Sequence, residues 1–169
     1  MEYAYITTIG QDSHAFDLNK SCDHIMLAGV KIPHDHPYIA NSDGDVVLHA
    51  LTNAISGFTC HNILGGVSDK MCLEDGIKDS REYLKVALEN LKKFEGTSIV
   101  HVSMTIECKR PKLMPHMEAM RLSLQSLLDI PASHIGITAT TGEGLTSFGR
   151  GEGMQVFVML TLRSQLPDA

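Results

Sequence analysis

Apolar residues recur at helical spacing between residues 43 and 57. At 100° per residue they form one stripe, which we expect to be buried: Val47, Leu51, Ala54, Ile55 and Phe58. Ser42 or Asp43 is expected to cap the start of this helix. His49 lies nearly opposite the stripe and close to the helix N-terminus, where anions are favoured. Two interpretations of His49 stay open: a solvated polar face, or a site completed by residues elsewhere in the chain.

Strand-like segments show a period of two, most clearly at residues 99–108, where apolar and polar positions alternate. Further strands are predicted at 4–10, 25–32, 135–141 and 154–162, and further helices at about 79–94 and from the turn at Pro115 to about residue 128. The segment 59–78 is irregular, which is typical of a lid or binding loop. The order of elements predicts one α+β domain over residues 1–169, a mixed α/β two-layer arrangement. Most helices should pack on one face of a four- to five-stranded mixed sheet.

The composition indicates a globular protein and disfavours membrane-spanning and nucleic-acid-binding classes. With 43% hydrophobic and 20% charged residues, the chain is expected to be globular. No apolar run is long enough for a membrane span, and no secretory signal is visible at the N-terminus. The four cysteines are widely spaced and form no C-x-x-C pair, which favours reduced thiols and a cytoplasmic location. A formal charge of −6 without a long basic block disfavours a nucleic-acid partner.

Candidate metal ligands lie in separated parts of the chain. Asp12 and His14 come at the end of the first predicted strand, and side chains at i and i+2 of extended chain point the same way. With His49 they would make a set of two histidines and one carboxylate, which catalytic zinc commonly uses with its fourth position open. Glu143, in a glycine-rich turn, is a candidate ligand for Mg²⁺ or Mn²⁺. An exposed turn would also account for Asp12 and His14, so spacing alone gives a candidate site for a metal and a phosphate.

A set of short motifs, in fixed order over residues 9–153, carries a family resemblance. The motifs are Gly10-x-Asp12-x-His14-x-Phe16, Ala28-Gly29-Val30-x-Ile32-Pro33, Ser42-Asp43-Gly44-Asp45-Val46-x-x-His49-Ala50-Leu51, Asp79-Ser80-Arg81-Glu82, Pro111-Lys112-x-x-Pro115-His116, Ala139-Thr140-Thr141-x-Glu143 and Gly149-Arg150-Gly151-Glu152-Gly153. Each motif alone is weak, but the ordered set is specific. The sequence resembles the 2-C-methyl-D-erythritol 2,4-cyclodiphosphate synthase family of the non-mevalonate isoprenoid pathway.

The resemblance implies a cyclising phosphorus–oxygen lyase. In that family the 2-phosphate of 4-diphosphocytidyl-2-C-methyl-D-erythritol 2-phosphate attacks the β-phosphorus, CMP leaves, and a cyclic diphosphate forms. The nucleophile is already an ionised phosphate, so the enzyme needs no serine or cysteine nucleophile. It must instead align two anions and stabilise the charge on the β-phosphate.

The resemblance also assigns roles to residues of this sequence. Asp12, His14 and His49 would hold one Zn²⁺ per subunit, Glu143 would hold a second divalent ion, Mg²⁺ or Mn²⁺, and Asn41 and Thr141 would stabilise the transition state. Residues expected to contact the cytidine diphosphate substrate are Asp12, His14, Asn41, Ser42, Asn62, Asp69, Cys108, Lys109, Arg110, Pro111, Lys112, Leu113, Met114, Ala139, Thr140, Thr141, Gly142, Glu143 and Arg150. The family is a homotrimer with sites between subunits, one giving the zinc half and its neighbour the cytidine half.

This sequence departs from the family pattern at a few positions. Asn41 stands where the family usually has histidine; it can donate a hydrogen bond but carries no charge. Within residues 59–73 only Asn62 and Asp69 have counterparts in the usual loop. Two alternatives to the cyclising lyase are a zinc-dependent phosphoesterase that uses metal-bound water and a non-catalytic binder of isoprenoid diphosphates.

Overall fold

The computed structural model describes residues 2–165, in which four strands form one mixed sheet with the order β1-β6-β4-β5. The strands are β1 (Tyr3–Ala15), β4 (Thr97–Glu107), β5 (Ile135–Thr140) and β6 (Gly153–Gln165). The two longest strands, β1 and β6, pair antiparallel from end to end, β4 is antiparallel to β6, and β5 is parallel to β4. The four-stranded mixed sheet agrees with the sequence-based expectation.

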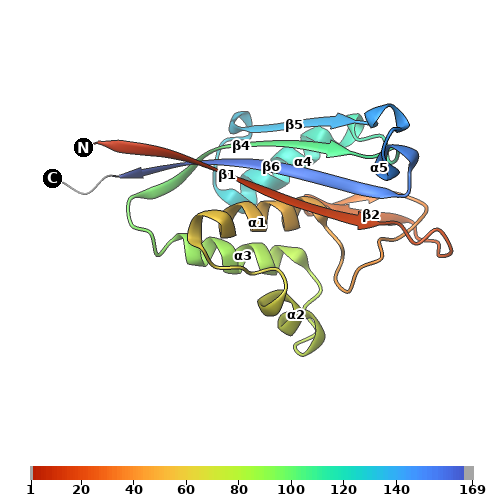
Figure 1. The fold of residues 1–169 in the computed structure, drawn as a ribbon, viewed down its shortest axis with the longest axis horizontal. Coiled ribbons are helices and arrows are strands. Elements are labelled where there is room, and N and C mark those ends of the chain that lie inside the picture. Colours follow the sequence, from red (N-terminus) through yellow and green to blue (C-terminus); the bar gives the residue numbers. More distant parts are fainter. Residues whose placement is uncertain (1, 166–169) are drawn as a thin grey trace.

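Helices cover one face of this sheet (Figure 1). The three longest are α1 (Val46–Thr59), α3 (Ser80–Leu91) and α4 (Met117–Leu128). In Figure 1, α1 lies beneath β1 and β6, and α3 lies below α1, farther from the sheet. Alternate residues of β6 are buried against the helices, while Phe157 and Met159, between them, are exposed on the opposite face. The period-two pattern of the sequence therefore marks the face that forms the core.

The first strand is longer than the sequence indicated. Residues 11–15 were expected to follow the strand, but β1 runs to Ala15 because its second half pairs with the start of β6. Asp12 and His14 consequently lie within β1. Their register partners in β6, Val156 and Met154, are buried on the helix-covered face, so both side chains face α1.

Two other expectations about local structure were wrong. Residues 25–32 form a hairpin of β2 (His24–Leu27) and β3 (Val30–Pro33) rather than one strand, because Ala28 and Gly29 both take positive φ, as a two-residue turn requires. The segment 59–78, expected to be irregular, contains α2 (Gly66–Leu73). The remaining short elements are η1 (Met114–His116), η2 (Ala132–His134), η3 (Gly142–Gly144) and α5 (Ser147–Arg150). Within residues 2–165, no helix has the length and apolar character needed to cross a membrane.

The start and the surroundings of α1 also differ from the prediction. Asp45, not Ser42 or Asp43, is the N-cap, and its carboxylate accepts a hydrogen bond from Leu48 N at 3.0 Å. The polar side of the helix is not solvated, because α1 lies between the sheet and α3. Polar residues of that side are buried: Asp45, His49, Thr52 and Ser56. Of the two interpretations of His49, the solvated face is therefore excluded.

Candidate metal centre and active site

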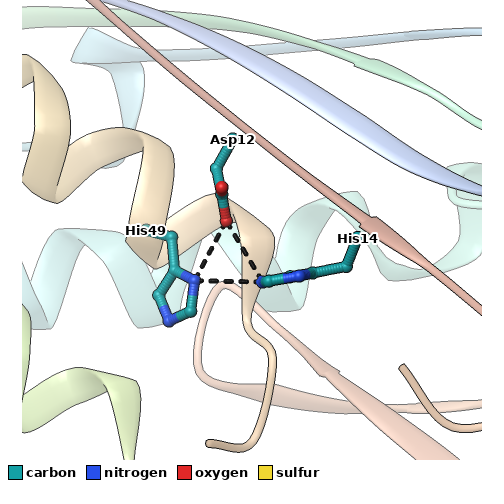
Figure 2. Close-up of side chains that lie close together, drawn as sticks. All are labelled: Asp12, His14 and His49. Atoms are coloured by element: carbon teal, nitrogen blue, oxygen red, sulfur yellow. Dashed lines mark hydrogen bonds and ion pairs between the residues drawn. The ribbon is translucent and has the colours of Figure 1, made fainter. Parts of the chain in front are cut away.

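Three side chains predicted as metal ligands meet at one point between β1 and α1 (Figure 2). His49 Nδ1 lies 3.0 Å from Asp12 Oδ2, His14 Nε2 lies 3.2 Å from the same oxygen, and the two ring nitrogens are 3.2 Å apart. In Figure 2 the carboxylate and both rings point inward to the space they enclose. The i, i+2 spacing on β1 and the position of His49 on α1 thus produce the cluster expected from the sequence.

A glycine makes this approach possible. Gly10 of β1 lies against the backbone of α1, where a Cβ would be 1.9 Å from the Ala50 carbonyl oxygen. The two elements therefore pack closer than any side chain at position 10 would allow. Asp12 lies two residues further along the strand on the same side, and it reaches His49 because of this close packing.

The cluster has the chemistry of a metal site. Burial alone would favour the neutral acid, but hydrogen bonds with His14 and His49 lower the pKa of Asp12 to about 2. An ionised carboxylate and two imidazole nitrogens are the donors that zinc accepts, and three protein ligands leave a fourth position for substrate. Among residues 2–165 this is the only group of three or more His, Cys, Asp or Glu side chains placed to share an ion.

A cavity of about 420 Å³ opens beside the cluster. Its lining includes six residues predicted from the sequence for metal or substrate: Asp12, His14, Asn41, Ser42, His49 and Asp69. Asp69 reaches the cavity from α2, the helix that was not expected. Asn62 is exposed and is not part of the lining, so its assignment to the substrate stays a prediction.

A second cavity, of about 550 Å³, lies in the glycine-rich region and is lined by Lys109, Thr141, Glu143, Gly144, Gly149 and Arg150. Four of these residues were predicted for substrate or metal: Lys109, Thr141, Glu143 and Arg150. The two cavities share no lining residue, and Glu143 does not belong to the Asp12–His14–His49 cluster. Within one chain the predicted site is therefore divided into two separate halves.

The loop predicted to form the cytidine pocket follows β4. Cys108 and Leu113 are buried, so neither side chain is open to a ligand, and burial raises the pKa of the Cys108 thiol to about 11. Arg110 and Pro111 are joined by a cis peptide bond. The other loop members are exposed or half-buried: Lys109, Arg110, Pro111, Lys112 and Met114. Ala139 and Thr140 end β5, and the Thr140 hydroxyl accepts a hydrogen bond from Gly142 N at 3.0 Å.

Sequence reasoning missed two residues beside His49. Ser80 Oγ lies 2.8 Å from His49 Nε2, and Tyr83 lines the same cavity as the metal cluster. Ser80 belongs to the motif Asp79-Ser80-Arg81-Glu82, but the sequence analysis assigned it no role at the site. Its role beside the metal cluster depends on the packing of α3 against α1, which no local pattern reveals.

The chain is similar in sequence and in fold to known proteins. A 2-C-methyl-D-erythritol 2,4-cyclodiphosphate synthase of Chlamydia caviae is 47% identical over 95% of this chain and 90% of its own length. The bifunctional IspDF of Campylobacter jejuni matches with a TM-score of 0.84 and 30% identity over 97% of this chain, which spans only 43% of that longer protein.

A CDP-bound 2C-methyl-D-erythritol-2,4-cyclodiphosphate synthase matches with a TM-score of 0.74 and 29% identity, over 93% of this chain and 99% of its own. The model of the YgbB family matches residues 5–163, nearly the whole chain. With the metal cluster, the divided site and the mixed sheet all in place, the chain belongs to the YgbB family.

Proposed function

We propose that this chain catalyses the reaction for which its relatives are named. It converts 4-diphosphocytidyl-2-C-methyl-D-erythritol 2-phosphate to 2-C-methyl-D-erythritol 2,4-cyclodiphosphate in isoprenoid precursor biosynthesis. An oxygen of the 2-phosphate forms a bond to the β-phosphorus, the bond from that phosphorus to the CMP oxygen breaks, and CMP leaves. The observation that carries the proposal is the Asp12–His14–His49 cluster at the wall of a cavity large enough for phosphate groups.

The donor set fits Zn²⁺, and Asp12, His14 and His49 would hold it. Bound there, zinc supplies a Lewis acid that polarises and orients a phosphate oxygen. Glu143 would hold a second divalent ion, Mg²⁺ or Mn²⁺, because a carboxylate is a ligand that harder ions prefer. The spread of these four ligands over two cavities supports a substrate that bridges two sites.

The protein's own groups align and neutralise the substrate. Asn41 and Ser42 line the metal cavity, where an amide and a hydroxyl can donate hydrogen bonds to phosphate oxygens. Lys112 and Arg150 would neutralise the diphosphate, and Arg150 lines the second cavity together with Lys109. Such local cations are needed because the chain has a net charge of −6. Thr141, in the same cavity, is the second residue proposed to stabilise the transition state.

We further propose that the chain works as a homotrimer with sites between subunits. The sheet face away from the helices carries exposed apolar side chains, among them Ile9, Phe157 and Met159. A contiguous apolar surface of this kind is typical of a protein–protein interface. Assembly through this face would bring the zinc half of one subunit beside the cytidine half of its neighbour. Sedimentation equilibrium should then give three times the chain mass, and a monomer that turns over substrate would contradict the shared site.

The test of the activity is CMP release from the diphosphocytidyl substrate, followed by ³¹P NMR in ¹⁸O-labelled water. The cyclising reaction takes up no water, so neither CMP nor the cyclic product should contain the label. Label in CMP, or in a linear bisphosphate formed in place of the cyclic product, would instead identify the phosphoesterase alternative. His49→Ala should lose zinc and turnover together, and a variant that keeps full turnover would overturn the proposed site. A protein that binds zinc and CMP but releases no CMP would favour the non-catalytic binder. The cytoplasmic location stays a prediction.

A further inference from the structure

The second ring nitrogen of His49 makes a contact that the metal cluster does not use. His49 Nε2 lies 2.8 Å from the hydroxyl oxygen of Ser80, the first residue of α3. Ser80 is fully buried, and the His49 side chain is only 9% exposed. The contact therefore lies inside the protein, on the side of the ring away from Asp12 and His14.

Asp43 fixes the direction of the Ser80 hydroxyl. Its carboxylate accepts three hydrogen bonds: from Ser80 Oγ, from Ser80 N at 3.1 Å and from Asp45 N at 3.1 Å. Its own backbone N–H donates to the Lys78 carbonyl oxygen at 2.9 Å, which holds the loop before α1 against the start of α3. An ionised carboxylate can only accept hydrogen bonds. The single hydroxyl proton of Ser80 therefore points to Asp43.

The orientation of His49 follows from this. Because the hydroxyl proton goes to Asp43, Ser80 Oγ can only accept a hydrogen bond from the ring, and His49 Nε2 is the donor. In the neutral imidazole the other nitrogen, Nδ1, then carries the lone pair. Nδ1 is the atom that faces Asp12 and His14. The hydrogen-bonded series Asp43–Ser80–His49 thus leaves the lone pair of His49 Nδ1 available to bind a metal ion.

His14 is held differently. Among the described residues, its Nδ1 makes no hydrogen bond, and its ring lies against Tyr38 with the centroids 5.7 Å apart. The hydrogen-bonded support behind a ligand is therefore specific to His49. Partners of this kind fix the tautomer and the ring orientation of a metal-bound histidine, and their loss commonly weakens metal affinity 10- to 100-fold.

We propose that Ser80 and Asp43 are positioning residues of the metal centre, acting through His49. The inference rests on the metal site of the proposed function. It adds two residues that do not contact the ligand atoms facing the metal. It also explains why the loop before α1 and the start of α3 are bonded to each other: the two segments together form the support behind one ligand.

The test compares Ser80→Ala with Ser123→Ala. Ser123 is a partly buried serine of α4 whose hydroxyl donates to the Ala28 carbonyl oxygen at 2.6 Å, away from the metal cluster. Zinc affinity is measured by competition with a chromophoric chelator, and circular dichroism checks that each variant is folded. We expect Ser80→Ala to bind zinc about 10- to 100-fold more weakly and Ser123→Ala to stay within about threefold of the wild type. Ser80→Thr, which keeps the hydroxyl, should recover most of the affinity.

A second measurement needs no Ser80 variant. In the zinc-loaded wild-type protein, the His49 Nε2–H proton should give a resonance protected from exchange with water, assigned by its loss in His49→Gln. A His49 Nε2–H that exchanges freely would overturn the inference even if Ser80→Ala fails to fold. A folded Ser80→Ala that binds zinc like the wild type would overturn the inference and leave the metal site intact. Wild-type protein that binds no zinc would remove the metal site and, with it, the inference.

Discussion

Gly10 in β1 and Ala50 in α1 lie so close that a Cβ at position 10 would be 1.9 Å from the Ala50 carbonyl oxygen. Gly10→Ala must therefore push the helix away from the strand. We expect a loss of about 3 kcal/mol or more in the free energy of unfolding, measured by urea denaturation. Because Asp12 and His49 come from these two elements, zinc affinity should fall as well.

Gly57 supplies the matched control for this substitution. It lies in α1 and also faces β1, but a Cβ there would lie 3.6 Å from its nearest neighbour, Thr8, which is ordinary contact. Gly57→Ala should raise stability by about 0.5–1 kcal/mol, since alanine is favoured over glycine inside a helix. If both variants lost stability equally, the close approach at Gly10 would not be the cause.

The sequence predicted the Asp12–His14–His49 cluster because the positions of its members depend on local periodicity. Side chains at positions 12 and 14 share a side of any extended segment, and His49 lies on a fixed side of its helix. Helical and strand periods also predicted the sheet and its buried face. The family resemblance predicted three further residues as substrate contacts, Asn41, Ser42 and Asp69, and all three line the metal cavity.

What the sequence could not predict depends on contacts between distant segments. Residues 11–15 extend β1 because β6 offers them partners. The polar side of α1 is buried because α3 packs near it, and Asp45 becomes the cap because the hairpin turn supplies further donors to its carboxylate. Ser80 acquires its role only when α3 brings it to His49. A single-sequence pattern contains no information on such pairings.

Asp45 is expected to contribute more to stability than an ordinary helix cap. Its buried carboxylate accepts from Leu48 N at the helix start and also from Ala28 N and Gly29 N of the hairpin turn, at 2.9 and 2.6 Å. Asp45→Ala should cost about 3 kcal/mol or more, because it leaves buried N–H groups without partners. Asp79→Ala, at the partly exposed cap of α3, should cost only about 0.5–1 kcal/mol in the same urea experiment.

Asp45 should also give stability a pH dependence. Burial raises its pKa from 3.8 to about 6 in the folded protein, despite the backbone hydrogen bonds that favour the carboxylate. Between pH 3.8 and about pH 6, the Asp45 carboxyl therefore binds its proton more tightly in the folded protein than in the unfolded chain. The stabilisation is therefore present at low pH and lost as the pH rises through about 6. Relative to Asp45→Asn, the wild type should lose at most about 3 kcal/mol between about pH 4 and pH 7.5. A pH-independent difference in unfolding free energy would contradict this.

The four cysteines should differ in reactivity toward a thiol reagent. Cys60 is exposed, Cys22 is partly buried, and Cys72 and Cys108 are buried. Burial also raises the pKa of Cys108 to about 11, which lowers its thiolate fraction. Mass spectrometry after brief alkylation of the folded protein should find Cys60 modified first and Cys108 last. In denaturant all four should react, and early modification of Cys108 in the folded protein would show that its loop opens.

Asn41 and Asn19 offer a matched pair for the chemistry of the metal cavity. Asn41 lines the cavity beside the candidate metal ligands. Within residues 2–165 its only hydrogen bond is made by its backbone carbonyl, which accepts from the Cys72 thiol at 3.3 Å. Its side-chain amide is free to donate to a phosphate oxygen, so Asn41→Ala should lower kcat by about 100-fold or more with zinc affinity unchanged. Asn19→Ala removes the same amide from an exposed position outside the cavity and should leave kcat unchanged. Turnover is measured as CMP release at saturating substrate. Equal effects in the two variants would mean that the Asn41 amide does not act on the transition state.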